Sequence, residues 1–110
     1  MIDLTTTTDG ATHTMALAGE LDHDTTPRLR EELSGLSLAA GDVLVLDLSG
    51  LEFCDSSGLS ALLSAHELAS GADAALNLRN PPRMLVKMLH MTGLAEIFTV
   101  QDTDRGDLTG

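Results

Sequence analysis

One short segment constrains the fold of this chain more than any other. Residues 43–48 read VLVLDL, an apolar run that contains a single aspartate. A strand with one face in water alternates apolar and polar residues, whereas a strand covered on both faces is apolar almost throughout. The segment therefore predicts a strand over Val43–Leu48 that is covered on both faces, and Gly41-Asp42 marks the break before it.

The residues before this strand predict a hairpin and a helix. Ile2–Thr8 and Thr12–Ala18 both alternate in polarity, and Asp9-Gly10 between them is a typical hairpin turn. Pro27 suits the first turn of a helix, and apolar residues at helical spacing extend that helix to about residue 37. The chain is therefore expected to open with two antiparallel strands followed by a helix.

After the central strand, helices and strands alternate. Helices are predicted over 57–70 and 80–93, and strands over 74–78 and 97–100. The order ββαβαβαβ predicts an α/β domain, with a mixed β-sheet that opens with the antiparallel N-terminal hairpin and packs against α-helices. Residues 1–100 are expected to form this one domain, and the polar, acidic residues 101–110 a tail or a short final helix. The helical residues expected to face the core are Leu29, Leu33, Leu36, Leu59, Leu62, Leu63, Ala69, Leu85, Met88, Leu89 and Met91.

The charge of the chain narrows the classes of partner. Seventeen acidic residues outweigh six basic ones, which leaves a net charge of −11, and the chain has two Phe but no Trp or Tyr. Nucleic-acid binding uses cationic contacts to phosphate and aromatic stacking, and docking on anionic lipid also uses cations. The composition therefore argues against direct nucleic-acid binding and against membrane docking. No apolar segment of about 20 residues and no signal peptide are visible, and one cysteine excludes an internal disulfide, so the cytoplasm is the predicted compartment.

Three groups of residues each allow two interpretations, of which the residue types favour the first. Arg79, Arg83 and Lys87 form either a solvated helix face or a contact for an acidic partner or a phosphate. The segment Asp22-His23-Asp24 is either a solvated acidic turn before a helix or a cation site. Cys54 is either a small core residue or a reactive thiol. The histidines show no metal-ligand spacing, and one of them, His66, is expected to be partly buried; they are His13, His23, His66 and His90.

The segment after the central strand is the strongest candidate for a functional site. Leu51–Leu59 leads into the second predicted helix, and its residues Asp55, Ser56 and Ser57 are types that cap helix N-termini. This pattern alone indicates only the start of a helix. A serine at a helix N-terminus also lies beside free backbone N–H groups and the positive end of the helix dipole, which can receive a phosphate. Gly58 has no side chain, so another protein is expected to approach the first turn closely there.

Four segments, in order, resemble one family. Asp55-Ser56-Ser57-Gly58-Leu59 resembles the phosphorylation loop of bacterial anti-sigma factor antagonists, which are STAS-domain proteins. Further segments are similar to the family's stretch after the second strand, its third strand, and the end of its third helix with the strand that follows. They are Gly19-Glu20-Leu21-Asp22, Leu46-Asp47-Leu48-Ser49, and Met91-Thr92-Gly93-Leu94 with Ile97-Phe98. The resemblance covers residues 2 to about 100, and it implies a STAS-like fold in a protein that is not an enzyme and holds no cofactor.

The resemblance also implies how the protein works. The unphosphorylated form is expected to bind an anti-sigma factor that is also a serine kinase, and thereby to free the sigma factor. Phosphorylation of Ser56, the first serine of the pair, is expected to end this binding, and a metal-dependent serine phosphatase to restore it. The residues that the resemblance assigns to partner binding are Asp22, Asp55, Ser57, Gly58 and Leu59.

Other functions remain as alternatives at this point. One is a STAS-domain component of a larger signalling assembly. Another is an aspartate-phosphorylated receiver domain with Asp47 as acceptor, but Lys87 is the only lysine available to it and a hairpin does not fit its all-parallel sheet. A small enzyme with Ser56 as nucleophile is the third, although the chain has no GxSxG, HExxH or P-loop motif.

Overall fold

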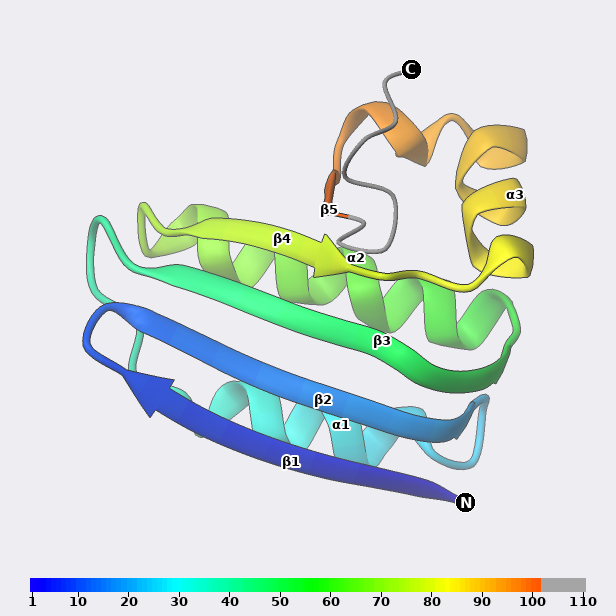
Figure 1. The fold of residues 1–110 in the computed structure, drawn as a ribbon, viewed down its shortest axis with the longest axis horizontal. Helices are drawn as coiled ribbons and strands as arrows, with labels where there is room; N and C mark the ends of the chain where they lie inside the picture. The colour runs from blue at the N-terminus through cyan, green and yellow to red at the C-terminus, as the bar shows by residue number, and fades with distance from the viewer. Residues whose placement is uncertain (102–110) are drawn as a thin grey trace.

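The computed structural model describes residues 1–101 of the chain and contains a five-stranded sheet (Figure 1). The sheet order is β1-β2-β3-β4-β5, with β1 antiparallel to β2 and the other pairs parallel. The elements in chain order are β1 (Ile2–Asp9), β2 (Thr12–Leu21), α1 (Thr26–Ser34), β3 (Val43–Cys54), α2 (Ser56–Gly71), β4 (Ala75–Arg79), α3 (Arg83–Thr92), the 3-10 helix η1 (Leu94–Glu96) and β5 (Thr99–Gln101). The predicted α/β architecture with an antiparallel opening hairpin is confirmed.

The opening hairpin forms at the predicted turn. Asp9 pairs with Thr12, and Gly10 between them has a φ of +62°, which a residue with a side chain rarely adopts. β2 runs three residues past the predicted end at Ala18. Its last residue, Leu21, pairs with Cys54 at the end of β3, with two irregularities of register on the way. The extension therefore depends on a partner strand that is distant in the sequence.

β3 is the central strand, and the prediction that both its faces are covered is confirmed for the apolar run. Leu44, Leu46 and Leu48 are fully buried on the face that packs against the helices, and Val45, which points the other way, is 3% exposed. The strand continues to Cys54, although the apolar run ends at Leu48. Its second half pairs with β2, whereas the described pairing with β4 stops at Asp47. The end of β3 therefore extends past β4.

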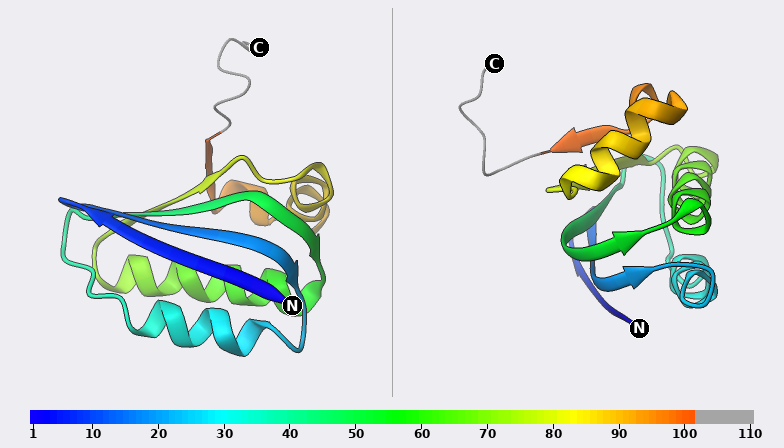
Figure 2. Two further views of the ribbon diagram at one scale, coloured as in Figure 1. Left: turned by 60° about the horizontal axis from the view of Figure 1, so that its bottom comes forward. Right: turned by 90° about the vertical axis from the view of Figure 1, so that its right-hand side faces the viewer.

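Helices α1 and α2 lie side by side and cover one face of the sheet, while α3 lies apart from them and contacts β3 and η1 (Figure 2). Their apolar faces meet the sheet through fully buried leucines, among them Leu29, Leu62, Leu85 and Leu89. Burial of these side chains is the main stabilising contribution of the helices. Within residues 1–101, the helices are all too short or too polar to span a membrane.

A few local predictions are wrong. The first helix ends at Ser34 rather than near residue 37, because Gly35 serves as its C-cap, and Leu36 is half-buried beyond it. Met91, predicted to face the core, is 78% exposed, since it lies two residues and therefore about 200° around the helix from the buried Leu89. The last strand begins at Thr99 instead of residue 97 and includes Gln101. The expected tail or final helix otherwise lies outside the described residues.

Candidate functional site

The first turn of α2 carries the serine that the sequence singled out. Asp55 is the N-cap in an extended conformation, and its Oδ1 accepts a hydrogen bond of 3.0 Å from the backbone N–H of Gly58. Ser56 is the first helical residue and is exposed, whereas Ser57 is half-buried. A side-chain cap of this kind stabilises a helix start and leaves the Ser56 hydroxyl in solvent beside the positive end of the helix dipole.

The end of β2 lies next to this turn. Leu21 pairs with Cys54, and the carbonyl of Leu21 also accepts a hydrogen bond of 3.2 Å from the backbone N–H of Asp55. Asp22 directly follows Leu21, and Asp55 directly follows its partner Cys54. The structure therefore places these two acidic residues at the same edge of the sheet, where α1 and α2 begin (Figure 1).

Asp22 organises the turn that leads into α1. Its Oδ1 accepts hydrogen bonds from the backbone N–H groups of Asp24 and Thr25, both at 3.0 Å, and from the Thr25 hydroxyl at 3.2 Å. Desolvation acts to raise the pKa of Asp22, but the hydrogen bonds from Thr25 and Asp24 outweigh it, so the pKa lies below its ordinary value. The acidic turn is thus held by its own hydrogen bonds. No group of three His, Cys, Asp or Glu residues in the described part of the chain is arranged to hold a metal ion.

Gly58 does not leave an open surface, which corrects the expectation from sequence. The residue is buried, and a Cβ placed on it would lie 2.5 Å from the carbonyl oxygen of Leu21 and 2.7 Å from the Cys54 sulfur. Leu59 is 6% exposed and belongs to the hydrophobic core. Both residues face the sheet because α2 packs against it from its first turn, so neither presents a side to a partner.

Cys54 and Phe53 at the end of β3 have opposite environments. The Cys54 side chain lies in the core, where burial, and less strongly the charge of Asp55, raise the pKa of the thiol to about 11. This supports the interpretation of Cys54 as a structural residue. Phe53 is 48% exposed, while the other phenylalanine, Phe98, is buried. Phe53 was not predicted as a site residue. Strict alternation would place Glu52 on the core face with Cys54, but both Glu52 and Phe53 are exposed because the register between β2 and β3 shifts at this point.

The surface around Ser56 is acidic. Glu52 and Asp24 are exposed, and Asp22 and Asp55 are half-buried close to the turn. Within residues 1–101, no Arg or Lys side chain forms an ion pair with any of these carboxylates. A negatively charged group attached to Ser56 would therefore lie among carboxylates of the same charge.

The basic residues that the sequence grouped together lie on other elements. Arg79 ends β4 opposite Asp47, while Arg83 and Lys87 are exposed on α3. Oδ1 of Asp47 accepts hydrogen bonds from the backbone N–H and hydroxyl of Ser49, at 3.1 and 2.9 Å. Asp47 therefore organises its own strand, and the antiparallel β1 contradicts the all-parallel sheet of a receiver domain.

Two histidines have partners that the sequence did not predict. His13 is buried, and its Nε2 lies 2.9 Å from Oδ2 of Asp42 while its Nδ1 lies 3.2 Å from the Thr8 hydroxyl. His66 is half-buried, as expected, and packs edge-to-face on Phe98 with ring centroids 5.8 Å apart. Both histidines therefore have structural surroundings away from the start of α2.

Known proteins share this sequence pattern and this fold. The family described as "Mlab, STAS domain" matches residues 4–101. The "Anti-sigma F factor antagonist" of Paenibacillus polymyxa is 34% identical over 96 residues, which cover 84% of this chain and 80% of that protein. The crystal structure of an anti-sigma factor antagonist from Mycobacterium paratuberculosis is 26% identical, with a TM-score of 0.74 and coverage of 92% of this chain and 86% of that one. The structure of the Bacillus cell fate determinant SpoIIAA in its phosphorylated form has the same fold, with a TM-score of 0.71 at 23% identity and coverage of 93% and 90%. Because the family match spans nearly the whole described chain and agrees with its topology, the protein belongs to the STAS domain family.

Proposed function

We propose that the chain is an anti-sigma factor antagonist controlled by phosphorylation of Ser56. In this proposal the unphosphorylated form binds an anti-sigma factor with serine kinase activity and frees the sigma factor, and a metal-dependent serine phosphatase later removes the phosphate and restores binding. The observation that carries the proposal is the exposed hydroxyl of Ser56 at the capped start of α2, in a chain that is 34% identical to an anti-sigma F factor antagonist. The protein acts by binding and has no catalytic role of its own.

The surroundings of Ser56 suit a switch that leaves the fold intact. A phosphate adds about −1.5 to −2 charges. In the free protein, the N-terminus of α2 favours that charge by about 0.3–1 kcal/mol, so phosphorylation is not expected to unfold the helix. In a complex, the same phosphate would lose water while lying near Asp22, Asp55 and Glu52, at a cost of about 1–3 kcal/mol or more. Because this cost to the complex exceeds the gain in the free protein, the expected result is release of the partner.

Two substitutions at Ser56 test this proposal. Ser56→Ala protein serves first as bait in a lysate of the source cell, and the anti-sigma factor that it retains is identified and purified. Calorimetric titration of that factor is expected to give wild-type affinity for Ser56→Ala and about a tenfold to hundredfold loss for Ser56→Asp. Thr7→Asp is the control for added charge and is expected to keep wild-type affinity, because Thr7 is exposed on β1 near the hairpin turn, at the other end of the sheet from the start of α2.

Phosphate mapping supplies a second, independent test. Incubation of the wild-type protein with the purified factor and ATP is expected to place phosphate on Ser56, and the label is expected to survive acid, as a phosphoserine does. Phosphate on Ser57, or an acid-labile acyl phosphate, would contradict the assignment. Equal affinity of the wild-type and Ser56→Asp proteins for the factor would contradict the switch itself.

A further inference from the structure

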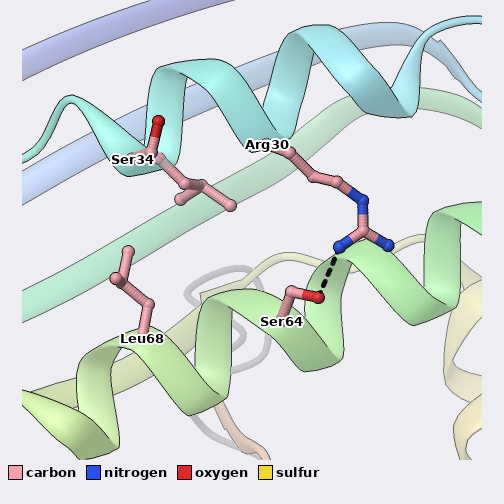
Figure 3. A pocket seen from close by; sticks show the side chains of 5 residues that line it. Arg30, Ser34, Ser64 and Leu68 are labelled. Carbon is pink, nitrogen blue, oxygen red and sulfur yellow. Dashed lines mark hydrogen bonds between the residues drawn. The ribbon is translucent and has the colours of Figure 1, made fainter.

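A surface groove lies between the two helices that cover the sheet. It has a volume of about 170 Å³ and is lined by Arg30, Leu33 and Ser34 from α1 and by Ser64 and Leu68 from α2. Figure 3 shows the Arg30 side chain extending from α1 towards Ser64, with Leu68 facing the groove further along α2. We call these five residues the α1–α2 groove.

Arg30 gives the groove a positive charge. Its Nη1 donates a hydrogen bond of 2.6 Å to the Ser64 hydroxyl, and its Nη2 lies 3.5 Å from the Ser60 hydroxyl. Glu31 and Glu32 follow it directly on α1, yet Arg30 forms no ion pair with an acidic residue in the part of the chain that the structure describes. Serine hydroxyls are neutral and a guanidinium has five N–H donors, so donors and charge remain for an anionic group.

Leucines supply the apolar part of the groove. Leu33 is 3% exposed and belongs to the core, whereas Leu68 is 38% exposed and is one of the few large apolar side chains on the described surface. An aliphatic side chain placed against Leu68 would remove its exposed area from water. The groove is therefore complementary to an aliphatic side chain next to a carboxylate.

The groove and Ser56 lie on the same helix. Leu68 is twelve residues after Ser56, so the two positions are about 18 Å apart along α2. A typical interface buries about 800 Å² on each partner, which corresponds to a disc about 32 Å wide. One partner of ordinary size that contacts Ser56 can therefore also reach the groove.

We propose that the α1–α2 groove is a second contact for the anti-sigma factor, which inserts an aliphatic side chain against Leu68 and pairs a carboxylate with Arg30. This inference rests on the proposed function. The groove contact fixes the orientation of the partner along α2, while Ser56 controls release at the start of the helix. The charge distribution of the chain supports this occupant. Around Ser56 the partner faces the carboxylates of this chain, whereas at Arg30 it meets an exposed positive charge, which favours an acidic group of the partner at that point.

Substitutions in the groove test the proposal against matched controls outside it. The probe is the purified anti-sigma factor, and the measurement is its affinity by calorimetric titration. Arg30→Glu is expected to weaken binding about tenfold or more, and Arg30→Lys by less, because lysine keeps the charge but loses the fork of donors. Arg83→Glu makes the same change of charge on the exposed surface of α3 and is expected to leave the affinity unchanged.

The apolar part has its own variant and control. Leu68→Ser is expected to weaken binding about tenfold. Met91→Ser removes an exposed apolar side chain from α3 and is expected to have no effect. Melting curves of all five variants verify that each remains folded, and since Arg30, Leu68 and both control residues are exposed, wild-type melting temperatures are expected.

The outcomes separate the groove from the switch. Wild-type affinity of both Arg30→Glu and Leu68→Ser, together with a loss for Ser56→Asp, would overturn the groove and leave the proposed function standing. Loss of affinity in the groove variants with none for Ser56→Asp would support the groove and refute the switch. A wild-type chain that sediments as a dimer, and that Arg30→Glu converts to a monomer, would overturn the proposal because a second copy of the chain would then occupy the groove.

Discussion

Replacement of Gly58 by alanine measures how closely the start of α2 is packed against β2. The added Cβ would lie 2.5 Å from the carbonyl oxygen of Leu21, 2.7 Å from the Cys54 sulfur and 2.9 Å from Cγ of Leu21, whereas ordinary contacts of a Cβ are 3.4–4 Å. The helix must therefore move outward by several tenths of an ångström. The Leu21 carbonyl cannot yield freely, because it accepts the hydrogen bond from the backbone N–H of Asp55.

The expected magnitude follows from two opposing effects. Overpacking of a core typically costs about 1–3 kcal/mol in the free energy of unfolding. Here the added Cβ would clash with the backbone carbonyl oxygen of Leu21. Alanine is a better helix former than glycine by about 1 kcal/mol in a helix interior, and this partly offsets the cost. Because a backbone carbonyl cannot rotate away from the added Cβ, the cost of overpacking is expected at the upper end of its range, about 2–3 kcal/mol. We therefore expect a net loss of about 1–2 kcal/mol in the free energy of unfolding, or roughly 5–15 °C in melting temperature for a chain of this size.

Gly71→Ala is the matched control in the same helix. Gly71 is exposed at the end of α2, and a Cβ there would meet nothing within 4 Å. Circular dichroism melts are expected to show an unchanged or higher melting temperature for Gly71→Ala and a lower one for Gly58→Ala. If Gly58→Ala melts at or above the wild-type temperature, the close packing of this turn is refuted and an open approach at Gly58 is again possible.

Three further predictions concern single side chains. A hydrogen bond from the backbone N–H of Ala39, and a second from His13, lower the pKa of Asp42. Its ionised form therefore stabilises the fold above the ordinary carboxyl pKa, and that stability is lost as the pH falls below about 4; urea midpoints between pH 6 and 3 should fall less steeply in Asp42→Asn. With a pKa of about 11, Cys54 is expected to resist iodoacetamide at pH 8 in the native protein and to react once the chain is unfolded in urea, as mass spectrometry would detect. Asp55→Ala removes the cap on Gly58 and is expected to cost about 0.5–2 kcal/mol in urea unfolding, whereas Asp55→Asn should keep most of that stability.

Local signals in the sequence determined most of the secondary structure. The turn at Asp9-Gly10, the apolar run Val43–Leu48 and the capping residues at 55–57 each act through neighbours within a few residues, and each predicted element is present. The start of α2 could be predicted for the same reason, since the bond from Gly58 to Asp55 spans only three residues. The exposure of Ser56 follows from that helix start.

The tertiary structure alone decided which surfaces exist around that helix. The role of Gly58 depends on Leu21, which is 37 residues away, and the groove depends on Arg30 reaching Ser64 over 34 residues. Neither contact has a local sequence signal, because sequence spacing gives the face of a helix on which a residue lies but not the neighbour opposite that face. The neighbour is set by strand register and by the packing of α1 and α2 on the sheet, and these are properties of the folded chain as a whole.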